Sequence, residues 1–63
     1  MKLSLKALRT NAGLRQIDLA VAVGVSKKTI GAWENGKAMP TADKIDAICS
    51  ALGVSYDDIR WKP

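Results

Sequence analysis

The chain has 63 residues and a net charge of +4, and with 48% hydrophobic but only 5% aromatic residues it supports one small domain with an aliphatic core. A single cysteine and the absence of histidine exclude an internal disulfide bond and a structural zinc site, and we expect no metal or other cofactor. No apolar run approaches the roughly 20 residues of a membrane-spanning helix, and the N-terminus lacks the long apolar region of a signal peptide, so we expect a cytoplasmic protein with no membrane partner.

Five short helices are predicted in chain order from the spacing of apolar residues and from the residues that punctuate them, and no strand is predicted. Ser, Thr and Gly stand where helix caps and stops are needed, as Ser4 and Gly13 do around the first helix. The expected helices cover residues 5–12, 16–23, 27–34, 42–52 and 56–60. We therefore expect an all-α, compact bundle of five short helices over residues 1–60, with a frayed tail at 61–63.

The basic residues are concentrated in the first part of the chain. Residues 1–37 hold seven Lys and Arg against two acidic residues, whereas residues 38–63 hold three against four. Clustered positive charge attracts polyanions and releases their counterions, which suggests a phosphate-bearing partner. A solvated basic surface would explain the same asymmetry, so the charge alone decides nothing.

Residues 16–34 contain two short helices separated by a turn at Gly24. A helix-turn-helix needs a residue there that accepts a left-handed backbone, and glycine does so at the lowest cost. Ala20 stands where the second helix must approach the third closely. The apolar residues that would close the wedge between these helices and the core are Leu19, Val23, Val25, Ile30 and Trp33.

The third of these helices has two different faces. Ile30 and Trp33 point inward, and the opposite side is basic at its N-terminal end and small further along. Basic side chains reach base edges or phosphates, and small residues let a helix backbone approach the major groove. The residues of this outward face are Lys27, Lys28, Gly31, Ala32 and Asn35.

The run LRQIDLAVAVGVSKKTIGAWENGK, residues 14–37, resembles the helix-turn-helix of Cro and phage repressors, the xenobiotic-response-element family. The resemblance continues through Pro40-Thr41 and residues 51–55, and so covers nearly the whole chain. It implies a lambda-repressor-like fold and a sequence-specific DNA-binding transcriptional regulator. The resemblance also implies a repressor of phage or prophage type that reads a pseudo-palindromic operator with its third helix in the major groove.

The resemblance implies DNA contacts at the start of the second helix, in the first turn of the third, and in the loop after it. Gln16 matches a glutamine that contacts a phosphate, and Ala32 matches a base-facing position that here can only touch a thymine methyl group. Arg15 stands where a small capping residue is usual, and would add a phosphate contact at the expense of a weaker cap. The expected DNA-binding residues are Arg15, Gln16, Ser26, Lys27, Lys28, Thr29, Ala32, Asn35 and Lys37.

Arg9 and Glu34 match an ion pair that links the first and third helices in repressors of this kind, and we expect it to be structural. Cys49 shares the apolar face of its helix and is expected to be an inert, buried thiol. Asp57 and Asp58 stand in the first turn of their expected helix, where the helix dipole favours negative charge, and they do not resemble a catalytic pair. An active site would also need a pocket and an acid–base or nucleophile partner, and the sequence indicates neither. We therefore expect neither an enzyme nor a small-molecule substrate.

Ile17, Val21 and Ala22 stand where the family commonly has charged residues. They either form an exposed contact for a protein partner or tuck against Met39 or a neighbouring helix. An alternative function is therefore a protein-interaction module of the same fold, resembling an antitoxin or antirepressor. On operator DNA we expect a weak or DNA-assisted homodimer, which would use Val54, Tyr56, Ile59 or Trp61.

Overall fold

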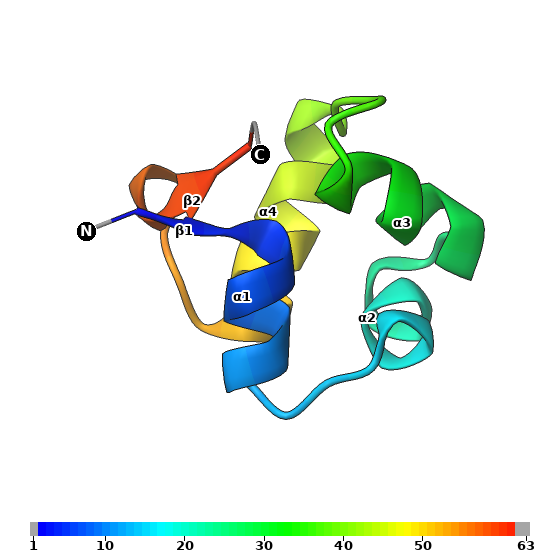
Figure 1. Cartoon of the computed structure of the whole chain (residues 1–63), viewed down its shortest axis with the longest axis horizontal. Helices are drawn as coiled ribbons and strands as arrows, with labels where there is room; N and C mark the ends of the chain where they lie inside the picture. The colour runs from blue at the N-terminus through cyan, green and yellow to red at the C-terminus, as the bar shows by residue number, and fades with distance from the viewer. Residues whose placement is uncertain (1, 62–63) are drawn as a thin grey trace.

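Four α-helices and a pair of two-residue strands form the part of the chain that the computed structural model describes, residues 2–61 (Figure 1). In chain order they are β1 (Leu3–Ser4), α1 (Leu5–Asn11), α2 (Gln16–Val23), α3 (Lys27–Glu34), α4 (Ala42–Leu52), the 3-10 turn η1 (Tyr56–Asp58) and β2 (Ile59–Arg60). The four α-helices lie where the sequence predicts them. None of the helices within residues 2–61 is long and apolar enough to cross a lipid bilayer.

Side-chain hydroxyls begin two of the helices. The Ser4 Oγ accepts from the Ala7 backbone N–H at 3.1 Å at the start of α1. The Ser26 Oγ accepts from the Thr29 backbone N–H, also at 3.1 Å, at the start of α3. Each bond satisfies a backbone donor that has no partner inside its helix. The capping residues thus fix where α1 and α3 begin.

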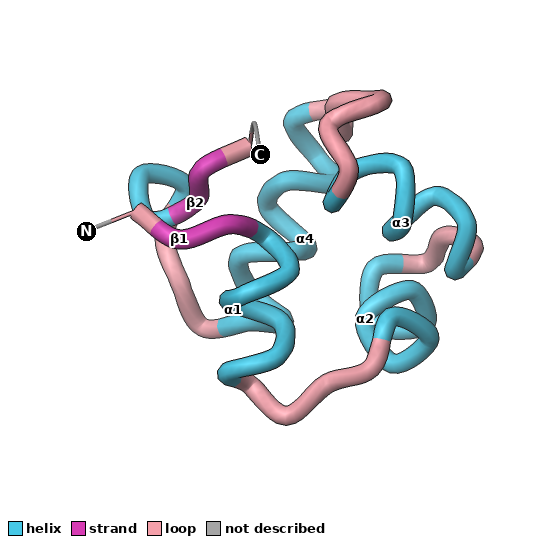
Figure 2. Tube along the Cα trace, viewed as in Figure 1, coloured by secondary structure: helices cyan, strands magenta, loops and turns pink. Residues whose placement is uncertain are grey.

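The turn between α2 and α3 is set by Gly24. Its φ of 83° is left-handed, and its N–H donates to the Ala20 carbonyl oxygen at 2.8 Å. The next N–H, that of Val25, donates to the same oxygen at 3.0 Å, which closes α2 and sends the chain directly into α3. Figure 2 shows how short this connection is beside the loop of residues 35–41 that joins α3 to α4.

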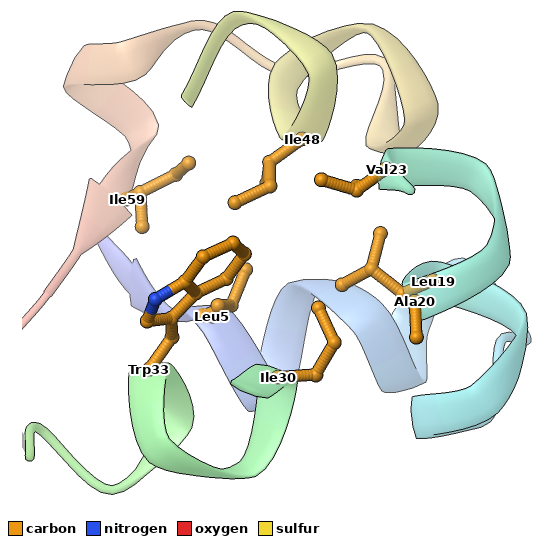
Figure 3. Packing of buried hydrophobic residues seen from close by; sticks show 8 residues of the cluster. All are labelled: Leu5, Leu19, Ala20, Val23, Ile30, Trp33, Ile48 and Ile59. Carbon is orange, nitrogen blue, oxygen red and sulfur yellow. The ribbon is translucent and has the colours of Figure 1, made fainter. Parts of the chain in front are cut away.

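The core lies where α2, α3 and α4 meet the β1–α1 segment and β2. Figure 3 shows the Trp33 ring extending from α3 toward Leu5 and Ile59, with Ile48 of α4 facing it from the far side. Ala20 is fully buried on α2, so the close approach expected there is confirmed. The buried apolar residues are Leu5, Leu19, Ala20, Val23, Ile30, Trp33, Ile48 and Ile59. They come from all four α-helices and from β2, and none comes from β1 or the 3-10 turn.

The prediction of a fifth helix at 56–60 is wrong. Ser55 and Asp58 do form a helix start, since the Asp58 Oδ2 accepts from the Ser55 N–H at 2.9 Å. Only one 3-10 turn follows, because Ile59 is extended (φ −102°, ψ 126°) and buries its side chain in the core. The helix is thus ended by tertiary packing of Ile59, which a local pattern does not contain.

The expectation that no strand forms is also wrong. Leu3 pairs in parallel with Ile59, and Ser4 with Arg60, so the two ends of the domain lie side by side (Figure 1). Two-residue strands are too short to produce an alternating pattern, and the pairing joins residues at opposite ends of the chain. Of the tail expected at 61–63, Trp61 is partly buried against the core, and residues 62–63 lie outside the described residues.

Candidate nucleic-acid interface

An open depression of about 610 Å³ lies on the outward side of α3, next to the start of α2. Basic and amide side chains line it, together with two small residues in the middle of α3. The lining residues are Gln16, Lys27, Lys28, Gly31, Ala32, Asn35 and Lys37. Six of these seven were predicted to bind DNA from the sequence, and the structure brings them together on one surface.

Positive charge in the depression is not neutralised by neighbouring acids. Lys27, Lys28 and Lys37 are all exposed, and none of them forms an ion pair with any residue from 2 to 61. Three free ammonium groups around a concave surface produce a positive potential that attracts an anionic partner. The depression therefore has the charge and the shape to receive a polyanion.

Behind the depression, Glu34 accepts hydrogen bonds from two helices. Its carboxylate pairs with the Arg9 guanidinium of α1, with Nε–Oε2 at 2.5 Å, and the two side chains are only 11% and 3% exposed. The Gln16 amide of α2 donates to the Glu34 Oε1 at 2.9 Å. A further Arg9 nitrogen, Nη1, donates to the Leu14 carbonyl oxygen at 2.7 Å. The predicted ion pair is present, and it also holds Gln16.

Arg15 lies at the N-cap of α2, and its guanidinium is already engaged. Both Nε and Nη2 of Arg15 donate to the Asp18 carboxylate at 3.0 Å, and Asp18 also accepts from the Arg15 backbone N–H at 2.8 Å. The side-chain hydrogen bonds from Arg15, followed by its backbone N–H, hold the pKa of Asp18 below its usual value. Asp18 thus compensates for the missing small cap, and Arg15 does not line the depression.

The Ser26 and Thr29 hydroxyls lie outside the depression. Their oxygens are 2.9 Å apart, and Ser26 also accepts from the Thr29 backbone N–H. Both side chains are therefore used in starting α3, which is a structural task. The structure does not place these two residues with the others predicted to bind DNA.

The sequence profile of a family described as "Helix-turn-helix" matches residues 5–59, which is most of the chain. The chain belongs to the helix-turn-helix family. The resemblance drawn from the motifs of residues 14–37 is thereby confirmed.

Three curated relatives show how the helix-turn-helix domain recurs. It is 38% identical over 56 residues to antitoxin PezA of Streptococcus pneumoniae, a match that covers 89% of this chain and 35% of PezA. It is 44% identical over 41 residues to the 26 kDa repressor protein of Escherichia phage HK022, covering 65% of this chain and 17% of the repressor. It is 34% identical over 61 residues to the uncharacterized HTH-type transcriptional regulator YgzD of Bacillus subtilis, covering 97% and 92%. The chain thus spans a minor part of the first two relatives and nearly all of the third.

A second exposed surface of the helix-turn-helix domain lies on α2. Ile17 is 42% and Val21 75% exposed, and the neighbouring Ala22 is exposed as well. Met39, which could have covered them, is itself 53% exposed. We call Ile17, Val21 and Ala22 the α2 patch. These side chains are therefore exposed and not tucked away, while a contact with a protein partner remains a prediction.

Two features of the site were not predicted. Gly31 was assigned to the small outward face of α3 that lets the helix approach DNA, but it was not among the expected DNA-binding residues, and the structure places it in the lining of the depression. The hydrogen bond from Gln16 to Glu34 joins residues 18 positions apart, and no sequence pattern indicates it.

Of the four residues considered for self-association, Ile59 must be excluded, because it is 2% exposed and belongs to the core.

Proposed function

We propose that this domain is a DNA-binding transcriptional regulator, a repressor of phage or prophage type, that places α3 in the major groove of operator DNA. The observation that carries the proposal is the set of three lysines that line the depression on α3 and form no ion pair with any described residue. Lysine ammonium groups bind phosphates and the O6 and N7 atoms of guanine. Membership of the helix-turn-helix family supports the same function. We propose that the protein acts in the cytoplasm.

In the proposed complex, Lys27 and Lys28 at the start of α3 reach base edges or adjacent phosphates. Gln16 has two amide hydrogens, and because one is held by Glu34 the other is available to a phosphate. Asn35 and Lys37 follow α3 and approach the sugar–phosphate backbone. Arg15 can reach a phosphate only by giving up its bonds to Asp18, so we assign it a minor role.

Two copies would read a pseudo-palindromic operator with half-sites about one helical turn apart. We propose that the copies meet weakly through Tyr56, which is 53% exposed, and through the partly buried Val54 and Trp61. The Tyr56 and Trp61 rings pack together with centroids 6.4 Å apart and so offer a joint aromatic surface. Sedimentation with and without operator DNA checks the assembly, since a tight dimer in the absence of DNA would contradict it.

The decisive experiment selects binding sequences from a random pool of duplex DNA and then measures affinity at several salt concentrations. We expect a pseudo-palindromic sequence, and an affinity that falls steeply with salt because bound lysines release counterions. The double variant Lys27→Ala/Lys28→Ala should lose specific binding and show a shallower salt dependence. Each phosphate contact removed should change the slope of log K against log salt by about 0.9.

A matched control removes the same charge elsewhere. Lys2 and Lys6 are exposed and lie outside the depression, so Lys2→Ala/Lys6→Ala lowers the net charge equally. We expect this variant to keep the selected sequence and most of the affinity. Equal losses of DNA affinity in the two double variants would mean that only the net charge matters. If the wild type selects no sequence from the pool, the regulator function is ruled out.

The exposed α2 patch supports a second candidate function, a protein-binding module resembling an antitoxin, as one relative is named. Ile17→Glu/Val21→Lys should leave folding unchanged, because both side chains already face solvent. Pull-down from a host lysate with wild type and variant, followed by identification and purified-partner titration, tests it. A partner bound by both proteins with equal affinity would remove this function.

A further inference from the structure

Gly31 is the fifth of the eight residues of α3, and nothing within residues 2–61 explains a glycine there. Its backbone is ordinary right-handed helix, unlike the four glycines with positive φ. Among the residues that the structure describes, the nearest neighbour of a methyl group built on its Cα would be the Gln16 Nε2 at 3.8 Å, which is an ordinary van der Waals contact. Glycine is a poorer helix former than alanine. Because α3 has room for alanine at position 31, the glycine weakens the helix without an internal reason.

The place of Gly31 suggests that the missing constraint lies outside the chain. Gly31 and Ala32 line the depression together with hydrogen-bond donors such as Lys27 and Gln16. The Gly31 carbonyl oxygen accepts from the Asn35 N–H at 3.0 Å, so its main hydrogen bond lies within the chain. With no side chain at Gly31 and only a methyl group at Ala32, a small apolar group can approach the helix backbone closely here.

In the major groove of DNA the only apolar group on a base edge is the C5-methyl of thymine. We propose that Gly31 is a specificity-determining residue that receives the methyl group of a thymine in each half-site, an inference that rests on the proposed DNA-binding function. The absence of a side chain at Gly31 leaves room for the methyl group, and the Ala32 methyl contacts it from the side. Lys27 and Lys28 then reach bases nearer the start of α3.

The test removes one methyl group from the DNA and, separately, adds one methyl group to the protein at Gly31. The probe is the operator selected from the random pool, with thymine replaced by uracil at one position at a time. We expect the wild type to lose about fourfold in affinity at one thymine of the half-site, as burial of one methyl group predicts. Gly31→Ala should bind the thymine operator more weakly than the wild type and should lose its preference for thymine at that position, because its added methyl group fills the space.

Two controls separate binding from stability. Gly31→Ala should raise the melting temperature by about 4–8 °C, because alanine favours the helix and meets no clash. Ser50→Ala, at an exposed position of α4 outside the depression, also improves helix propensity and should leave affinity and thymine preference unchanged.

Three results would overturn the inference. One is a wild type that binds the operator but is indifferent to uracil at every position. Another is a Gly31→Ala protein with an unchanged thymine preference, and the last is a lower melting temperature for that variant, which would give the glycine an internal reason. Failure of the wild type to select any sequence would instead reject the proposed DNA-binding function, so the two failures are distinguishable.

Discussion

The Gln16 amide at the start of α2 donates to the Glu34 carboxylate at the end of α3 across 2.9 Å. Because Glu34 is also paired with Arg9, one buried carboxylate holds three segments of the chain in register. Gln16 lines the depression, whereas Arg9 and Glu34 are not among its lining residues. The ion pair therefore orients a residue on the proposed DNA-binding surface without being part of that surface.

Replacing Arg9 alone should strongly destabilise the fold. Arg9→Met leaves the Glu34 charge buried with only one hydrogen-bond donor, and we expect a loss of about 3 kcal/mol in unfolding free energy. Because a domain of this size has little stability to spare, the double variant Arg9→Met/Glu34→Leu is the companion measurement. Its apolar side chains can replace the pair, so urea denaturation should find it more stable than Arg9→Met. A double variant that is less stable than the single one would contradict this account.

The same double variant separates folding from binding. Gln16 loses its acceptor when Glu34 becomes leucine, so its amide is no longer held toward the depression. We expect operator affinity to fall by several-fold in a folded protein, as one hydrogen bond of about 1 kcal/mol predicts. Gln16→Ala in the wild-type background should produce a similar loss. If the double variant binds as the wild type does, Glu34 does not position Gln16.

Removing the cap of α3 should weaken the domain measurably. Ser26→Ala deletes the acceptor for the Thr29 N–H and the hydroxyl contact between the two residues, and we expect a loss of about 1 kcal/mol. The melting temperature should fall by roughly 4–8 °C for a chain of this length. Ser26→Asp restores an acceptor and should recover most of the loss. Equal melting temperatures for Ser26→Ala and Ser26→Asp would show that the cap is not the cause.

Acid should destabilise the fold through two aspartates at the surface, Asp18 and Asp58. Hydrogen bonds from Arg15 lower the pKa of Asp18, and hydrogen bonds from the Ser55 backbone N–H and hydroxyl lower that of Asp58. When the pKa of a carboxyl group is lower in the folded than in the unfolded chain, its ionised form stabilises the folded state at neutral pH. This stabilisation is lost as the pH falls and the group is protonated. Thermal melts should therefore show stability decreasing below about pH 5. Asp18→Asn/Asp58→Asn should be less stable at pH 7 and less sensitive to acid, and unchanged sensitivity would contradict the assignment.

The pairing of β1 with β2 should depend on one buried side chain. Ile59→Ala removes a core residue that is 2% exposed, and we expect a loss of about 2–4 kcal/mol. Tyr56→Ala, three residues away and largely exposed, is the matched control and should change stability by less than about 1 kcal/mol. Chemical denaturation of both variants checks the contrast. Similar losses in the two variants would mean that Ile59 does not anchor this end of the fold.

Helix positions and most of the site follow from local chemistry. Ser4, Ser26 and Gly24 determine helix ends through bonds to backbone groups a few residues away, so their sequence positions predict α1 to α3. The place of Lys27 and Lys28 in the site is likewise predictable, because both lie on the outward face of one helix. What escapes prediction depends on contacts between distant residues. The extended backbone of Ile59 and the pairing of Gln16 with Glu34 are both of this kind.

The parallel pairing of Leu3 with Ile59 places both ends of the domain on the side away from α2 and α3 (Figure 1). A fluorophore, affinity tag or second protein fused at either end therefore attaches behind the proposed reading surface. Two copies joined by a flexible tether through these ends would keep both α3 helices uncovered. A tandem fusion of this kind would convert the weak second binding event into an intramolecular one, with a tether length set by the spacing of the two half-sites.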